Sequence, residues 1–257
     1  MGKALTTPNF WNRTTSAVGR TYPNPTLCRM DYEITKIFHP FLEPKRGGEF
    51  VELGCGSSYL LPYFGRRYGF KISGIDFSDE RLTATRYNLS RSGICGKGLV
   101  CCDFRSIPEG WQNKFDVVYS GGVIEHFESQ MEILGVFANY LKQDGIMVTT
   151  VPHLKGFWGN LGRKLNREVD AGYIRMGLDD IVEAHHKAGL EVVYASYFRW
   201  LDFSIVNYSL LPLLLRKVVC TGIITLDLFL NLLFRIHKPK WLPKALYSDM
   251  VVVSKRC

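Results

Sequence analysis

Residues 51–57 read VELGCGS, a strand-like run that leads into a Gly-x-Gly turn. Glycines in such a turn let the backbone approach a ligand, and the helix that follows offers unpaired N–H groups. An open parallel sheet binds ligands at the carboxyl ends of its strands, which is where this turn falls. Tyr59 replaces the third glycine of the dinucleotide fingerprint, so the turn favours a nucleoside without a pyrophosphate.

Strand-like and helix-like segments alternate around this turn. The patterns predict strands at 49–53, 70–75, 98–102, 115–120, 146–151, 190–199 and 250–253, and helices at 24–42, 58–68, 78–92, 124–142 and 178–188. Such alternation is typical of a parallel sheet whose strands are joined by crossover helices. The fold class is therefore α/β.

Two acidic residues end successive predicted strands. Asp76 lies 22 positions after Gly54, where a carboxylate can accept hydrogen bonds from both hydroxyls of a ribose. Asp103 can accept a hydrogen bond from the exocyclic amine of an adenine, and Phe104 can stack on the ring. The order of these residues predicts one nucleoside site at the carboxyl edge of the sheet.

These motifs resemble the class I S-adenosylmethionine-dependent methyltransferases, particularly the group that includes quinone and small-molecule methyltransferases. The resemblance rests on residues 51–56, 74–78, 102–104, 115–118, 122–127 and 141–145. It implies a Rossmann-like, doubly wound sheet of seven strands in which the last strand is antiparallel. It also implies an enzyme that uses S-adenosylmethionine and releases S-adenosylhomocysteine. The donor contacts that it implies are Glu52, Gly54, Cys55, Gly56, Asp76, Phe77, Asp103, Phe104 and Ser120.

Methyl transfer to a hydroxyl group benefits from a general base. His126, beside the end of the fourth strand, is the first candidate, and His153, after the fifth strand, is the second. His185 and His186 are expected at the surface of an outer helix. No group of acidic residues and histidines has the spacing of a metal site, so no metal is predicted.

The chain divides into four predicted parts. Residues 1–48 form a helical extension that covers the substrate, 49–200 the donor-binding core, 201–245 an apolar and basic helical insertion, and 246–257 the final core strand. The apolar run at 201–234 falls short of a membrane span, which needs about 20 mostly apolar residues. Five basic residues follow it: Arg235, His237, Lys238, Lys240 and Lys244. The insertion is therefore interpreted as a substrate lid, a homodimer face or a peripheral membrane patch.

Composition limits the compartment and the partners of the protein. The 257 residues carry a formal net charge of +8, which suits nucleic acid, an anionic membrane or a phosphorylated substrate. Seven cysteines without CxxC pairs, and an amino-terminal sequence without an apolar signal core, predict a cytoplasmic protein. If the insertion is a membrane patch, the protein attaches peripherally at the inner membrane surface.

The acceptor is the least defined part of the interpretation. Residues 120–123 read SGGV and lack the Asn/Asp-Pro-Pro-Tyr signature of nucleobase amine methylation, which argues against a nucleic acid substrate. Apolar side chains beside cations outside the core favour a small hydrophobic acceptor, or one linked to a lipid or sugar. Two alternatives are an NAD-dependent reductase and a catalytically inactive relative that acts as a membrane or protein adaptor.

Overall fold

A computed structural model describes residues 3–7, 29–95, 98–165, 170–200 and 242–256. Between these last two ranges it also describes the single positions 212, 215, 218, 219, 221, 222, 225, 226 and 229. Most of the predicted insertion at 201–245, and the start of the helix predicted at 24–42, therefore lie outside the described residues. None of the helices within the described ranges is both long and apolar enough to cross a membrane.

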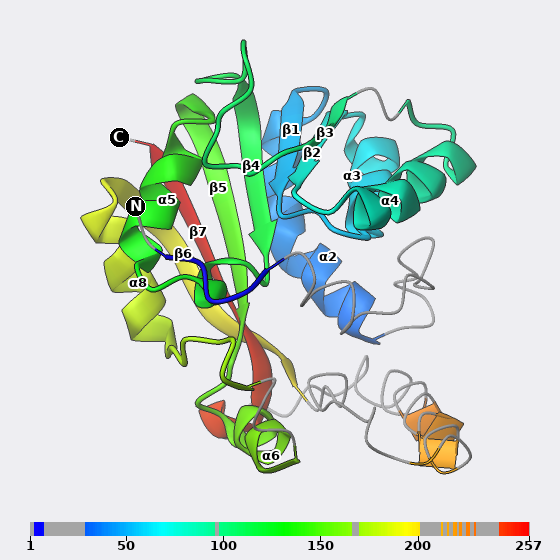
Figure 1. The fold of residues 1–257 in the computed structure, drawn as a ribbon, viewed down its shortest axis with the longest axis vertical. Coiled ribbons are helices and arrows are strands. Elements are labelled where there is room, and N and C mark those ends of the chain that lie inside the picture. Colours follow the sequence, from blue (N-terminus) through cyan, green and yellow to red (C-terminus); the bar gives the residue numbers. More distant parts are fainter. Residues whose placement is uncertain are drawn as a thin grey trace.

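Seven strands form one sheet in the order β3-β2-β1-β4-β5-β7-β6 (Figure 1). Their bounds are β1 Glu49–Leu53, β2 Lys71–Asp76, β3 Gly98–Cys101, β4 Phe115–Gly121, β5 Leu141–Pro152, β6 Leu190–Trp200 and β7 Tyr247–Arg256. Neighbours among the first five strands pair in parallel, whereas β7 pairs antiparallel with both β5 and β6. The predicted fold, with its antiparallel last strand, is confirmed.

Helices cover both faces of the sheet (Figure 1). Their bounds are α2 Arg29–Leu42, α3 Leu60–Tyr68, α4 Asp79–Arg91, α5 Gln130–Ala138, α6 Phe157–Leu165 and α8 Leu178–Lys187, with short 3-10 turns η1 Glu43–Lys45, η2 Ile124–His126 and η4 Lys244–Leu246. One buried cluster packs α2, α3 and α4 on one face, and a second packs α5 and α8 on the other. Neighbouring strand residues such as Val117 and Val118 belong to opposite clusters, as the two-residue period of a strand requires.

The helix predicted at 124–142 is wrong in its bounds. The chain forms η2 at its start, becomes extended at Phe127, and begins α5 only after Ser129, whose side chain caps the helix by accepting from the amide N–H of Glu132. Leu141 already belongs to β5. Ser129 is an N-cap signal inside an apolar pattern, and its local hydrogen bond starts a new helix there.

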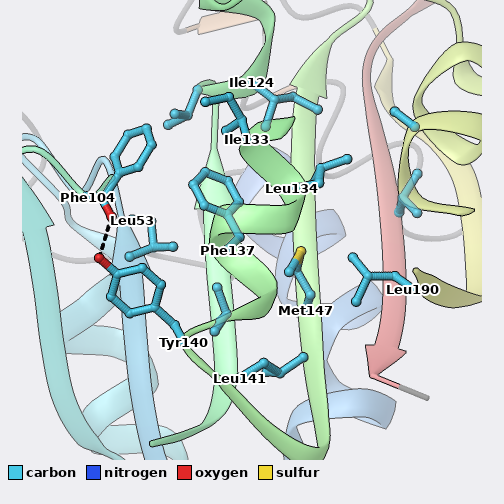
Figure 2. Close-up of a cluster of buried hydrophobic side chains, with 14 of the residues drawn as sticks. Leu53, Phe104, Ile124, Ile133, Leu134, Phe137, Tyr140, Leu141, Met147 and Leu190 are labelled. Carbon is cyan, nitrogen blue, oxygen red and sulfur yellow. Dashed lines mark hydrogen bonds between the residues drawn. The ribbon is translucent and has the colours of Figure 1, made fainter. Parts of the chain in front are cut away.

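The core on the α5 face supports the carboxyl edge of the sheet (Figure 2). Figure 2 shows Phe137 and Tyr140 packed below Phe104, in the loop after β3. The hydroxyl of Tyr140 donates to the main-chain carbonyl of Phe104 over 2.5 Å, and the rings of Phe104 and Phe137 meet edge to face at 5.2 Å. The loop after β3 is thus attached to the packed core.

His185 is buried, which corrects the prediction that it lies at the surface, whereas His186 is exposed as predicted. His185 lies on the side of α8 that packs against β7, and its Nδ1 lies 2.9 Å from the hydroxyl oxygen of Ser254. The buried side chains of α8, Ile181, Ala184 and His185, recur at the three- to four-residue spacing of one helix face, which places His185 toward the sheet and His186 outside it.

Candidate functional site

A cavity of about 340 Å³ lies where the carboxyl ends of the central strands meet. Its walls come from the glycine turn after β1, the ends of β2 and β4, the loop after β3, and the amino-terminal segment. The lining residues are Ala4, Thr6, Gly54, Asp76, Phe77, Arg81, Asp103, Phe104, Arg105, Gly121, Gly122, Val123, His126 and Phe127. The structure therefore brings five predicted donor residues and one predicted base to one cavity.

The glycine turn is closely fitted to its neighbours. Gly54 adopts a φ of +75°, and a Cβ at this position would lie 2.5 Å from Cγ2 of Val123, so only glycine fits here. The N–H of Gly54 and the N–H of Cys55 both donate to the carbonyl of Ile75, each over 2.9 Å. The turn is thereby bound to the end of β2.

Asp76 is the buried acceptor at the end of β2. Its Oδ2 accepts from the N–H of Gly56 over 2.7 Å, and its Oδ1 accepts from the N–H of Ser78 over 2.9 Å. Burial raises the pKa of Asp76, opposed by these N–H groups and by the charge of Arg81. The N–H of Phe77 also donates to this carboxylate. A carboxylate can accept about four hydrogen bonds, so Asp76 retains the capacity to accept from a hydroxyl group.

Asp103 is held by a cation that the sequence reasoning missed. Nε and Nη2 of Arg105 donate to its carboxylate over distances of 2.5–3.0 Å, and the guanidinium lies 5.7 Å from the ring centre of Phe127. Although burial acts to raise the pKa of Asp103, the hydrogen bonds and charge of Arg105 lower it. The carboxylate is therefore ionised and presented at the β3 side of the cavity.

Two aromatic residues complete this side of the cavity, as the sequence predicts. Phe77 follows Asp76 directly, and Phe104 follows Asp103. The ring of Phe104 is buried and packs edge to face against Phe127 at 5.6 Å. An apolar wall beside two carboxylates suits a flat heterocycle that carries hydroxyl and amine groups.

Four predicted donor residues are near the cavity but do not line it. Gly56 reaches it only through its N–H bond to Asp76. Glu52 is buried and accepts from the hydroxyl of Ser58 over 2.6 Å, and burial raises the pKa of Glu52 to about 8. Cys55 is buried in the core on the α3 face. The hydroxyl of Ser120 is buried just before the glycines of the cavity wall, with no hydrogen-bond partner in the part of the chain described.

His126 is the candidate base that lines the cavity. Its Nδ1 lies 2.7 Å from the carbonyl oxygen of Gly172, and because a carbonyl only accepts, Nδ1 carries the proton. Its Nε2 lies 3.8 Å from Oε1 of Glu125, and the ring of Tyr173 packs at 4.4 Å. Burial lowers the pKa of His126 to about 4, so the imidazole is neutral at pH 7 with its basic lone pair on Nε2.

His153 lies after β5 at the same edge of the sheet, but it does not line the cavity. Its Nδ1 donates to the carbonyl of Tyr247 over 3.1 Å, and its ring packs at 4.9 Å from that of Tyr197. The second candidate base is thus part of the contacts between the end of β5 and the start of β7, and its catalytic role stays a prediction.

Residues 3–7, within the extension predicted to cover the substrate, form a wall of the cavity as an extended segment and not as a helix. The N–H of Leu5 donates to the carbonyl of His126 over 2.8 Å, and the N–H of Glu128 donates to the carbonyl of Lys3 over 3.1 Å. Ala4 and Phe127 thereby form an isolated antiparallel bridge. The segment crosses near the carboxyl end of β4 (Figure 1), and no local sequence signal announces this pairing.

Comparisons with known proteins give a consistent family. The family described as "Methyltransferase domain" matches residues 28–195. A ubiquinone biosynthesis O-methyltransferase of Neisseria meningitidis is 26% identical over 102 residues, which cover 40% of this chain and 43% of that protein. A phosphoethanolamine N-methyltransferase of Zea mays is 31% identical over 118 residues, which cover 44% of this chain and 22% of that protein. The matched regions thus span less than half of these two relatives.

Solved structures show the same fold at low sequence identity. Phosphoethanolamine N-methyltransferase 2 of Haemonchus contortus, in complex with S-adenosyl-L-methionine, has a TM-score of 0.61 at 15% identity over 87% of this chain and 52% of that chain. Geranyl diphosphate C-methyltransferase of Streptomyces coelicolor, with Mg²⁺, geranyl diphosphate and S-adenosyl-L-homocysteine, has a TM-score of 0.59 at 11% identity over 89% and 78%.

Proposed function

Because this chain belongs to the methyltransferase domain family, we propose that it methylates a hydroxyl oxygen of a small hydrophobic acceptor, or of one linked to a lipid or sugar. S-Adenosylmethionine is the methyl donor of this enzyme, and when bound it supplies a sulfonium methyl carbon open to in-line attack. The observation that supports hydroxyl methylation is the neutral imidazole of His126 in the same cavity as the acids that suit a nucleoside.

The residues present fit this donor. In the proposal, Asp76 accepts a hydrogen bond from a ribose hydroxyl and Asp103 accepts from the adenine amine. Phe77 and Phe104 supply the apolar wall for the adenine. Ser120 does not line the cavity, so its contact with the donor stays a prediction.

In the proposed reaction, His126 accepts the proton of the acceptor hydroxyl at Nε2. The acceptor oxygen then forms its bond to the methyl carbon as the bond from that carbon to sulfur breaks. The Nδ1 hydrogen bond to Gly172 fixes the imidazole in the required tautomer, and the carbonyl stabilises the positive charge that the ring gains. His126 is buried, which limits the contact of its ring with water.

The O- and N-methylating relatives define the test of the acceptor type. Transfer of a radiolabelled methyl group would be measured with a prenylated catechol and with phosphoethanolamine as acceptors. We expect methylation of the catechol, and a 10²–10⁴-fold lower kcat in His126→Gln with unchanged affinity for S-adenosylhomocysteine. His186→Gln, on the exposed side of α8, is the matched control and should behave as wild type. Methylation of the amine alone, at a rate that His126→Gln does not alter, would refute the proposal.

We also propose that the insertion at 201–245 holds the enzyme peripherally on the inner face of the membrane, near a hydrophobic acceptor. Four described apolar side chains of the insertion are exposed, at helical spacing: Leu215, Val218, Leu226 and Phe229. Val218 is 63% exposed and Phe229 is 59% exposed, so these are large apolar groups in water. The Lys and Arg residues that follow in the sequence would each add about 1 kcal/mol on an anionic surface.

Co-sedimentation with lipid vesicles tests this attachment. We expect binding to vesicles that contain phosphatidylglycerol, weaker binding as the salt concentration rises, and little binding to neutral vesicles. A double variant, Val218→Asp with Phe229→Asp, should lose binding, whereas Val193→Asp, an exposed apolar position on β6, should not. Failure to bind at low salt, together with a concentration-dependent dimer in ultracentrifugation, would replace the membrane patch with a homodimer face.

A further inference from the structure

We propose that Arg81 binds the α-carboxylate of the methyl donor and makes the site selective for nucleosides that carry an intact amino-acid tail. The inference rests on the donor site proposed above. Arg81 is not among the donor contacts predicted from the sequence. With this role, the site should bind ligands that carry the tail carboxylate more tightly than ligands that lack it.

Arg81 lies in the first turn of α4 and reaches back to the glycine turn. Its main-chain N–H donates to the hydroxyl of Ser78, the N-cap of α4, over 3.3 Å. A Cβ built at Gly56 would lie 2.6 Å from Nη2 and 3.0 Å from Nε of the guanidinium. The whole guanidinium therefore lies against the backbone of Gly56, and its side chain lines the cavity.

Two arginines line the cavity, and they lie in different chemical settings. Arg105 is on the β3 side, where its fork is taken up by the carboxylate of Asp103. Arg81 is on the side of the glycine turn. Its positive charge affects the pKa of two titratable residues near that turn, Asp76 and His126. It lowers the pKa of Asp76 at the end of β2 and the pKa of His126 after β4, in each case less than burial shifts that pKa.

The strand order shows which part of the donor can meet each arginine. This part of the sheet has the order β3-β2-β1-β4. Asp103 lies after β3, and Asp76 is the last residue of β2. If these acids take the adenine and the ribose, the rest of the donor must extend past β1 toward β4, where His126 receives the acceptor. Gly54 and Arg81 line the cavity along that path, and the guanidinium of Arg81 lies against Gly56.

The amino-acid tail of the donor carries a carboxylate, which is costly to bring into a closed cavity without a paired charge. The planar fork of an arginine matches a carboxylate with two parallel hydrogen bonds. Arg81 is the cavity cation on the path of the tail, so it is the group that the carboxylate would meet.

Titration calorimetry with two ligands tests the assignment. The ligands are S-adenosylhomocysteine and S-adenosyl-3-thiopropylamine, which differ by the carboxylate alone. In Arg81→Met, which keeps an unbranched apolar stem but removes the guanidinium, we expect S-adenosylhomocysteine to bind about 10–100-fold more weakly and the decarboxylated ligand to bind as in wild type. Arg86→Met is the matched control on the same helix, because Arg86 is exposed and pairs with Asp79 outside the cavity.

Each outcome decides a different question. If Arg81→Met weakens the affinity for both ligands equally, the residue has a structural role only. If the affinity for both ligands is unchanged, Arg81 does not belong to the site. Either result overturns the inference and leaves the proposed function standing. A wild-type protein that binds neither ligand would overturn the donor site itself. Arg81→Lys, which keeps the charge but loses the fork, should recover part of the discrimination.

Discussion

Replacing Asp76 by asparagine tests the donor site at its most connected residue. Asp76 accepts the N–H of Gly56 at one oxygen and the N–H of Ser78 at the other. Asparagine keeps a single oxygen, so one of these main-chain donors faces an amide NH₂ group. The ribose hydroxyls would also lose a charged acceptor.

The expected magnitudes follow from these contacts. A hydrogen bond to a charged group contributes about 1.5–3 kcal/mol, so the loss for the ribose corresponds to a roughly 10–100-fold weaker affinity for S-adenosylhomocysteine. A main-chain N–H left unpaired in the interior costs about 1–3 kcal/mol of folding free energy. Removal of the charge offsets part of this cost, because burial raises the pKa of Asp76 and so disfavours its ionised form in the fold. We therefore expect a large loss of affinity and a small loss of stability.

Calorimetry measures the affinity, and urea unfolding measures the stability of the same preparation. Asp79→Asn removes one charge three residues later, at the exposed start of α4, and serves as the control. The reasoning is refuted if folded Asp76→Asn binds S-adenosylhomocysteine as wild type does. It is equally refuted if Asp79→Asn loses as much affinity as Asp76→Asn.

Three further predictions follow from buried groups and from the amino-terminal segment. The pKa of Glu52 is raised to about 8 in the fold, so wild type should lose stability as the pH rises from about 4.5 to 8. In urea unfolding, Glu52→Gln should show a flatter pH dependence than wild type and should be more stable than wild type at pH 8. The pKa of His185 is lowered to about 3 by burial, so wild type should lose stability as the pH falls from 6.5 toward 3; His185→Asn, which can still bond to Ser254, should be less sensitive to acid in thermal melts. Leu5→Pro removes the N–H that donates to the carbonyl of His126, and calorimetry should detect weaker binding of S-adenosylhomocysteine with an unchanged melting temperature; unchanged binding would exclude this segment from the site.

The sequence predicts the sheet and the glycine turn because their signals are local. Short apolar segments between turn residues predict where the strands lie. The spacing of 22 positions from Gly54 to Asp76 predicts that this acid ends the next strand, as it does in β2. The same local signals predict the cavity residues that belong to these motifs, Gly54 and Asp76. Glu52 and Cys55 belong to the same motif but are buried. Glu52 alternates with Val51 and Leu53 along β1 and therefore faces the opposite side of the sheet, whereas Cys55 lies in the turn after the strand.

Other parts of the site depend on contacts between distant segments, which no local pattern specifies. The pairing of residues 3–7 with Phe127 joins segments far apart in the chain. The tautomer of His126 is fixed by the carbonyl of Gly172, which belongs to a loop without a recognisable motif. Arg105 was overlooked because its significance appears only once its side chain is seen on Asp103.

The attachment of residues 3–7 also sets how often the cavity wall opens. Two main-chain hydrogen bonds hold this segment to the chain around His126, and each contributes about 0.5–1.5 kcal/mol. If these bonds dominate, opening costs about 1–3 kcal/mol, which corresponds to between roughly one molecule in six and one in 160 being open at equilibrium. Such a population lets ligands exchange without unfolding any strand of the sheet. The residence time of the spent donor, measured by stopped-flow release, would then depend on this short segment and not on the packed core beneath it.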